Sequence, residues 1–148
     1  MYKIIHPIAG TTALATIVTF WLATVWSELL GSPATVITVK TLIPWGFLIL
    51  VPALAAASLS GFRLSMQHRG PLAIRKRKRM PFIAANGVLI LIPSALFLSC
   101  KAQRHELDTL FYLVQAVELV GGCTNITLLA LNMRDGIRLA RTRRRRLT

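Results

Sequence analysis

Residues 75–100 read RKRKRMPFIAANGVLILIPSALFLSC, in which five consecutive cations and a methionine precede twenty mostly apolar residues. At a rise of about 1.5 Å per residue, twenty residues of helix cross the roughly 30 Å hydrocarbon core of a bilayer. A cationic cluster directly before such a run is typical of the cytoplasmic end of a transmembrane helix. The stretch therefore predicts a membrane-spanning helix over residues 81–100.

Outward from this stretch, three further apolar runs cover about residues 7–30, 41–61 and 109–133. The whole chain of 148 residues is 54% hydrophobic with a mean hydropathy of +0.59, which is more apolar than a soluble domain. The runs lack the period-two alternation of barrel strands. We therefore predict an all-α fold, an integral membrane four-helix bundle formed by a single transmembrane domain.

Local signals refine the predicted helices. Asp108 directly precedes the fourth run and is a candidate N-cap, since a side-chain carboxylate can accept a hydrogen bond from a free amide of the first helical turn. Pro52 and Pro93 lie inside the second and third runs. Because proline removes a backbone donor, both helices are expected to be kinked.

The cations give a predicted orientation. Lys3, seven cations within residues 63–79 and seven within residues 134–146 make fifteen of the eighteen Lys and Arg residues. By the positive-inside rule, both termini, a basic loop at 62–80 and a basic tail at 134–148 then face the cytoplasm, most simply of a bacterial inner membrane. The three cations left for the opposite side are Lys40, Lys101 and Arg104.

The formal net charge of +13 also raises the question of nucleic-acid binding. Both long cationic clusters adjoin predicted spans, where they interact with anionic headgroups. The chain contains no nucleic-acid-binding motif. We therefore expect the partner of these clusters to be an anionic lipid surface and not nucleic acid.

The fourth run carries polar residues along one helical face, which is expected to look inward. Glu118 lies near mid-membrane on this face, where a carboxylate is costly unless it is protonated, paired or hydrated. One hypothesis is a proton or cation site formed by Glu118 with Gln115 and Asn125. The alternative is a protonated Glu118 that hydrogen-bonds a neighbour such as Thr16, Thr19 or Asn86. The whole face comprises Asp108, Tyr112, Gln115, Glu118, Gly122, Asn125 and Asn132.

Two histidines form a second candidate site. His6 at the start of the first run and His68 beyond the second are predicted on the same membrane side, each beside small residues such as Gly10. Two neutral imidazoles can ligate a haem iron, and arginines can pair with its propionates. The alternative is that each histidine hydrogen-bonds a headgroup or a helix end. The candidate arginines are Arg63, Arg69 and Arg138.

The chain resembles the small four-helix b-type cytochromes of bacterial inner membranes. The shared features are the number of helices, the chain length, both termini on the inner side, and a helix that starts at His6–Pro7 and is followed by Gly10. This resemblance implies a haem b on the cytoplasmic side, held by His6 and His68. It also implies electron transfer, with a quinone or a redox protein as partner, and membrane oxidoreductase activity if haem is bound.

Three functions therefore stand open from the sequence. The first is the haem-binding electron carrier, and the second is a small proton- or cation-coupled transporter or channel that uses Glu118. The third is a non-catalytic membrane subunit or scaffold whose basic loop docks a partner. No hydrolase, kinase or nucleotide-binding motif is present, and no catalytic residue is assigned. A homodimer is compatible with each of the three.

Overall fold

The computed structural model describes the backbone of residues 2–66 and 71–145, and the side chains of residues 5–61, 63 and 78–138. Its elements are α1 (Tyr2–Leu30), α2 (Pro33–Met66), α3 (Pro71–Asn86), the π-helical turn η1 (Gly87–Leu91), α4 (Ile92–Gln103) and α5 (Thr109–Arg145). Within these described residues, four segments are long and apolar enough to cross a membrane. They are Ile5–Leu30, Pro33–Gly61, Lys78–Gln103 and Thr109–Arg138.

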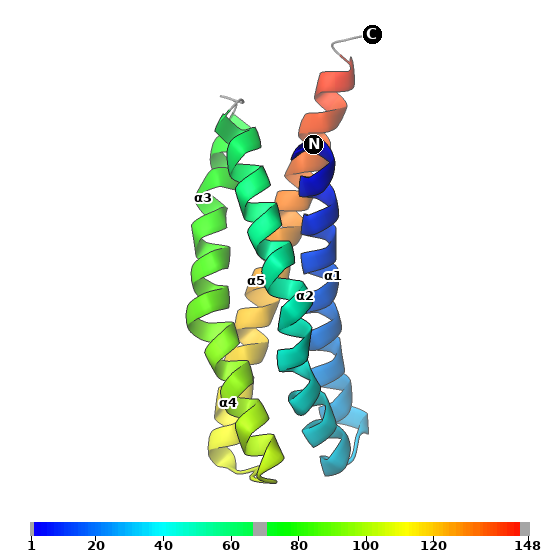
Figure 1. The fold of residues 1–148 in the computed structure, drawn as a ribbon, viewed down its shortest axis with the longest axis vertical. Helices are drawn as coiled ribbons and strands as arrows, with labels where there is room; N and C mark the ends of the chain where they lie inside the picture. The colour runs from blue at the N-terminus through cyan, green and yellow to red at the C-terminus, as the bar shows by residue number, and fades with distance from the viewer. Residues whose placement is uncertain (1, 67–70, 146–148) are drawn as a thin grey trace.

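The four spans lie side by side and alternate in direction, so that α1 begins and α5 ends at the same end of the molecule (Figure 1). α1 contacts α2 and α5, and the third span, made of α3, η1 and α4, contacts the same two helices. Within the described residues, α2 and α5 make no backbone contact of their own. These two helices therefore face each other diagonally across the interior.

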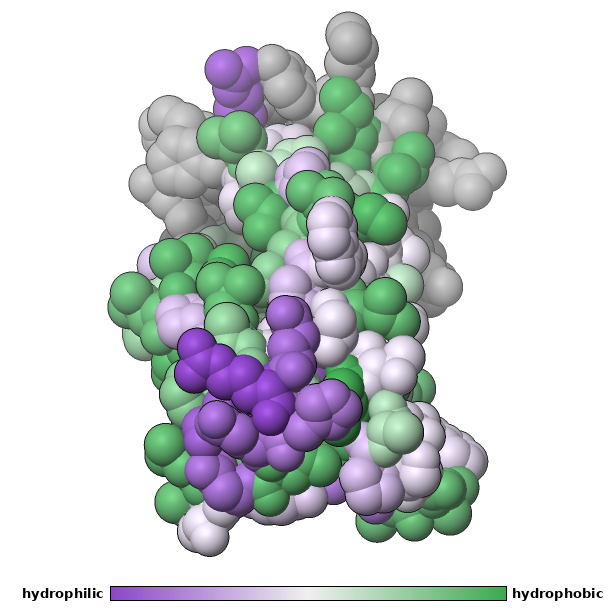
Figure 2. Space-filling view, turned by 60° about the horizontal axis from the view of Figure 1, so that its bottom comes forward, coloured by the Kyte–Doolittle hydropathy of each residue, from purple (hydrophilic) through white to green (hydrophobic). Residues whose placement is uncertain are grey.

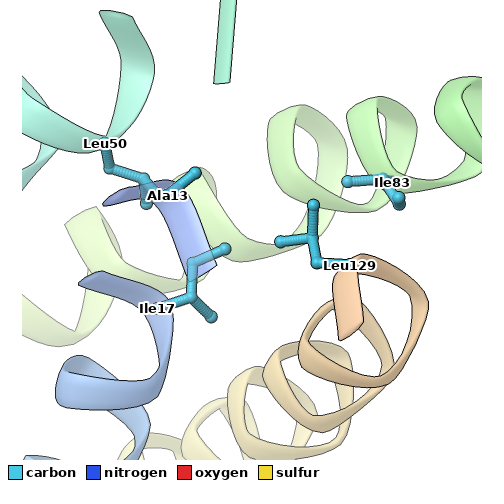
Figure 3. Packing of buried hydrophobic residues seen from close by; sticks show 5 residues of the cluster. All are labelled: Ala13, Ile17, Leu50, Ile83 and Leu129. Atoms are coloured by element: carbon cyan, nitrogen blue, oxygen red, sulfur yellow. The ribbon is translucent and has the colours of Figure 1, made fainter. Parts of the chain in front are cut away.

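The apolar core is small and the outside is apolar. One buried cluster gathers near the middle of the spans (Figure 3), where Ala13, Ile17, Leu50, Ile83 and Leu129 meet. Large side chains such as Leu48 and Leu89 instead point outward, each 72% exposed. Such an exterior suits contact with lipid chains, because the hydrocarbon takes the place of a protein core around these residues.

A hydrophilic patch of the described surface lies at one end of the spans. Figure 2 shows it at the end where α4 turns into α5, below a surface that is mostly hydrophobic or neutral. The residues exposed at this turn are Gln103, Arg104, His105, Glu106 and Asp108. This distribution is the one expected for spans that end in water.

The second span starts earlier than the sequence indicated. The predicted start was about residue 41, whereas α2 begins at Pro33. Proline suits the first helical position, and the carbonyl of Ser32 accepts the amide of Val36 at 3.1 Å. The connection between the first two spans is therefore only residues 31–32. Lys40, which we had assigned to an outer loop, lies about two turns inside α2.

The basic segments also differ from the predicted loop and tail. α2 continues to Met66 and α3 begins at Pro71, so most of the predicted loop at 62–80 is helical. α5 likewise extends through the predicted tail to Arg145. Lysine and arginine are good helix formers, so a helix that leaves the membrane can continue through them.

The predicted irregularity near Pro93 takes the form of a π-helical turn. The amide of Ile92 bonds to the carbonyl of Gly87, five residues earlier, and Pro93 follows with no amide hydrogen to donate. α2, in contrast, stays helical through Pro52. The kink expected at Pro52 remains a prediction.

The turn between α4 and α5 is closed by a cap on each side. Asp108 Oδ1 accepts the amide of Phe111 at 2.9 Å, which confirms the predicted N-cap of α5. At the end of α4, the amide of Glu106 bonds to Lys101 O at 3.0 Å and that of His105 bonds to Ala102 O at 2.9 Å. These two backbone hydrogen bonds form a Schellman cap, in which His105 has a positive φ of 58°.

Candidate functional site: a buried lysine–glutamate pair

Lys40 on α2 and Glu118 on α5 form an ion pair in the interior of the molecule. The side chain of Lys40 is 1% exposed and that of Glu118 is 11% exposed. Because α2 and α5 lie diagonally opposite, the lysine side chain bridges the space between them. Its Nζ also donates to Thr24 Oγ1 of α1 at 3.3 Å, so three helices meet at this ammonium group.

Both members of the pair lie inside segments that are long and apolar enough to cross a membrane, nearer the ends where α2 and α5 begin. Lys40 is about 10 Å along α2 from Pro33, and Glu118 is about 14 Å along α5 from Thr109, counted at 1.5 Å per residue. Both helices start at the same end of the molecule, which explains how the two side chains meet (Figure 1). Removing each charge from water costs several kcal/mol, which the mutual attraction offsets in part.

A second carboxylate belongs to the same site. Glu28 on α1 accepts a hydrogen bond from Gln115 Nε2 of α5 at 2.8 Å and also interacts electrostatically with Lys40. Gln115 is 4% exposed, and its Oε1 has no hydrogen-bond partner among the described residues. With all three groups ionised, Glu28, Lys40 and Glu118 together carry one net negative charge. The site can therefore accept one further positive charge.

A cavity of about 50 Å³ adjoins Glu118 between α1, α2, α4 and α5. The indole of Trp21 closes one side, because its Nε1 donates to the carbonyl of Leu119 at 3.0 Å. By volume the cavity has room for on the order of three waters. Apart from Glu118, Trp21 and Thr24 its lining is apolar, and the full set comprises Ile17, Phe20, Trp21, Thr24, Ile43, Phe47, Leu50, Leu91, Ala95, Glu118, Leu119 and Gly122.

Two asparagines join α3 to α5 beyond the cavity. Asn86 Nδ2 donates to Asn125 Oδ1 at 2.9 Å and to the carbonyl of Gly121 at 2.8 Å. Asn125 Nδ2 in turn points to the carbonyl of Ile83 at 3.4 Å. Hydrogen bonds of this kind between asparagine side chains and a neighbouring helix hold transmembrane helices together without burying charge. Asn125 itself is fully buried.

Further along α5, toward its C-terminal end, lie two more buried polar residues. Asp135 is 2% exposed and pairs with Arg79 of α3 at 2.8 Å. Asn132 is 4% exposed, and neither of its amide atoms has a hydrogen-bond partner among the described residues. Sequence analysis had placed Asn132 on the inward face but had not considered Asp135.

The predicted inward face of α5 is confirmed over most of its length. Its buried members are Gln115, Glu118, Gly122, Asn125 and Asn132. Tyr112 is exposed, and so is Asp108 in the turn before α5, so the polar face begins deeper than predicted.

The partner of Glu118, however, differs from each of the three that we had considered. Thr16 and Thr19 donate to carbonyls of their own helix, and Asn86 bonds to α5 as described above. The two residues that sequence reasoning missed are Lys40 and Glu28. Glu28 is a charged residue inside the first apolar run. Lys40 becomes a charged residue inside the second run once Pro33 is taken as the start of that helix.

The candidate haem ligands lie elsewhere. His6 Nδ1 is 2.9 Å from the carbonyl oxygen of Ala57 on α2, within hydrogen-bonding distance. A methyl group added at Gly61 would come within 2.8 Å of His6 Cε1, so the space that this glycine leaves is filled by the imidazole itself. No neighbouring atom lies within 4 Å of such a group at Gly10.

The other predicted haem contacts are only partly described. His68 and Arg69 lie outside the described residues. The side chains of Arg63 and Arg138 are exposed. Among the residues that were searched, no group of three or more His, Cys, Asp or Glu residues is arranged to hold a metal ion.

No protein-family model matches the chain, and comparison with curated proteins and with solved structures gave no significant match.

Proposed function

We propose that this protein carries protons across a membrane and that Glu118 is the group that binds them. The observation that supports this function best is the buried Lys40–Glu118 pair with a second carboxylate, Glu28, beside it. An ionisable group inside a membrane span is costly, and such groups usually mark a path for protons or ions. The end rich in Lys and Arg faces the cytoplasm in this proposal, since only Lys101 and Arg104 remain at the opposite end.

The charges of the site suggest how a proton is taken up. When a proton bonds to the Glu118 carboxylate, that group becomes neutral and no longer holds the Lys40 ammonium. Lys40 keeps its three protons and moves toward the Glu28 carboxylate, which replaces Glu118 as its counter-ion. Loss of the proton from Glu118 reverses the exchange. Every state of this cycle leaves the lysine paired, so no step buries an isolated ammonium.

A purely structural role for the pair is less favoured on energetic grounds. Replacing a buried ion pair by apolar side chains of similar size is often neutral or stabilising by about 1–4 kcal/mol. Apolar residues would therefore serve packing at least as well between these two helices. An ion pair in this place is better explained by a process that needs the charge.

The experiment is a proton-flux measurement in proteoliposomes that enclose a pH-sensitive dye. With a potassium diffusion potential across the vesicle membrane, the wild-type protein should change the internal pH, and Glu118→Gln should reduce the rate at least tenfold. Glu106→Gln is the matched control, because Glu106 lies exposed in the turn between α4 and α5. Equal rates for wild type and Glu118→Gln would overturn the proposal.

The same vesicles separate protons from other small cations. If a sodium gradient at constant pH drives a current that Glu118→Gln removes, while the dye signal is the same in both proteins, then the site carries sodium. A proton-selective site gives the opposite result. The third function, a scaffold, predicts no difference between the variants in either measurement.

Haem binding by His6 and His68 with electron transfer to a quinone or a protein remains a prediction from the sequence and from the cytochrome resemblance. The imidazole of His6 lies at the α1–α2 contact, 2.9 Å from the carbonyl oxygen of Ala57. The absorption spectrum described in the Discussion tests this function independently of proton flux.

A further inference from the structure

We infer that Asn132 binds internal water and forms the inner half of a proton path that runs along α5 from Asp135 to Glu118. The inference rests on the proposed function, because Glu118 is the destination of the path. It adds a hydrated site that proton uptake at Glu118 alone does not require.

The first observation is the state of Asn132 itself. Its side chain is buried, and neither its Nδ2 nor its Oδ1 has a hydrogen-bond partner among the described residues. Buried amide groups are nearly always satisfied by protein atoms or by ordered water. Within a membrane the cost of leaving them unsatisfied is larger, since lipid offers no hydrogen bonds. A site with two such atoms is therefore best completed by water, which both donates and accepts.

The second observation is the regular spacing of the buried polar residues. Glu118, Asn125 and Asn132 follow one another at intervals of seven residues, which is about two helical turns or 10.5 Å. They therefore lie on one face of α5, with each polar group above the next. Between Glu118 and Asn125, Gly122 adds no side chain and lines the cavity that adjoins Glu118.

The inner end of this face carries a buried carboxylate. Asp135 lies one turn beyond Asn132 and pairs with Arg79, whose side chain is 24% exposed. Arg134 Nε lies 3.7 Å from the other carboxylate oxygen, and its side chain is exposed. The carboxylate is thus buried, while both of its counter-ions reach the surface. Asp135 is placed to exchange protons with the cytoplasmic side in the orientation proposed above.

After a proton has passed along the path, every side chain and water again has the same covalent bonds as before. A proton arriving from Asp135 forms an O–H bond to the first water, and that water gives a different proton to the next. Asn132 orients these waters through its Nδ2 donor and its Oδ1 acceptor, but its own protons stay in place. At a hydrogen-bond spacing of about 2.8 Å, each of the two seven-residue intervals of the path needs roughly three waters, and the shorter interval from Asp135 to Asn132 needs about one.

Apolar neighbours explain why Asn132 matters for the path. Leu129 lies one turn before Asn132 and packs with Ile83 in the central cluster (Figure 3). Water has no hydrogen-bonding partner at Leu129, so it must be held on the asparagine side. Leu129 therefore offers a control at nearly the same depth on the same helix.

One test measures water access directly and does not depend on transport. Cys100 and Cys123 are exposed free thiols, so both are first replaced by alanine. In that background, Asn132→Cys and Leu129→Cys are exposed to 2-aminoethyl methanethiosulfonate, which is small, charged and soluble in water. We expect Asn132→Cys to react at least tenfold faster than Leu129→Cys. Equally slow reaction at both positions would overturn the inference.

The second test uses the proton-flux assay with Asn132→Leu, which has nearly the same size and no hydrogen-bonding atoms. The path predicts a loss of at least tenfold in flux together with an unfolding midpoint that is unchanged or higher, because an apolar side chain replaces a buried polar one. Asn132→Ser, which keeps a hydroxyl, should restore part of the flux.

The two proposals fail in distinguishable ways. Flux lost in Glu118→Gln but retained in Asn132→Leu contradicts the path and leaves the proposed function intact. Flux unchanged in both variants contradicts the proposed function, and the path along with it.

Discussion

Lys40 of α2 and Glu118 of α5 are joined by an ion pair although the backbones of their helices make no contact within the described residues. The pair spans the interior diagonally, and Thr24 of α1 accepts a second hydrogen bond from the ammonium. Most of the buried polar side chains of α5 lie on the same face as Glu118. In this arrangement, charge is held where apolar packing would suffice.

The two members of the pair are expected to differ in their effect on stability. Lys40→Met leaves two carboxylates without a counter-ion and should lower the free energy of unfolding by about 3–5 kcal/mol, the range for breaking a buried pair. Glu118→Gln should cost less, because Glu28 stays available to Lys40. Unfolding in mixed detergent micelles measures both values.

The double variant Lys40→Met/Glu118→Gln completes this double-mutant cycle. It removes both charges and should recover most of the stability lost in Lys40→Met. If the effects of the two substitutions simply add, the pair is not coupled and the arrangement described here is wrong.

His105 offers a stabilising substitution. Its φ of 58° lies in the left-handed region, which costs a side-chain-bearing residue about 1–2 kcal/mol and glycine almost nothing. His105→Gly should therefore raise the free energy of unfolding by about 1 kcal/mol, less the entropy that glycine adds to the unfolded chain. His105→Ala is the matched control, since it removes the imidazole and keeps the strain. Equal stabilities of the two variants would contradict the cap described here.

The turn before α5 predicts a dependence of stability on pH. The hydrogen bond from Lys101 and the cap bond from the Phe111 amide lower the pKa of Asp108 from its ordinary value of 3.8. A carboxylate with a lowered pKa in the folded state contributes stability that is full above 3.8 and is lost as the pH falls through the folded-state pKa.

Asp108→Asn isolates this effect, because asparagine also caps helices but carries no charge. The stability difference between wild type and Asp108→Asn should be constant from about pH 8 to pH 5 and shrink below the ordinary aspartate pKa. Chemical unfolding at a series of pH values measures it. A difference that grows on acidification would show the opposite sign of the pKa change.

Haem binding is tested by the absorption spectrum of protein purified from cells supplied with haem. If His6 and His68 ligate the iron, the protein should show a Soret band that is lost in His6→Ala and retained in His105→Ala. Colourless protein would remove the electron-carrier function and leave the proton-carrier proposal as it stands.

The fold was largely predictable because hydropathy acts over whole spans. Four apolar runs of sufficient length and the capping carboxylate of Asp108 predicted the elements that the structure contains. The inward face of α5 followed from helical periodicity alone, since a stripe of amides and a carboxylate is unfavourable against lipid.

The site itself was predicted only in part. Glu118, Gln115 and Asn125 were chosen as an ion site, but Lys40 was counted as a loop cation, which hid its role. The error came from reading Gly31–Ser32–Pro33 only as a helix end, although Pro33 also starts the next helix. Which residues meet across a diagonal, such as Lys40 and Glu118, depends on helix rotation, and single-sequence periodicity does not supply it.

The most direct test of the central claim is an infrared titration of the protein in lipid vesicles. If Glu118 takes up a proton within the membrane, acidification should produce a carboxylic C=O band in wild type that is missing in Glu118→Gln and present in Glu106→Gln. Identical difference spectra for wild type and Glu118→Gln over the full pH range in which the protein stays folded would contradict the claim that Glu118 binds the transported proton.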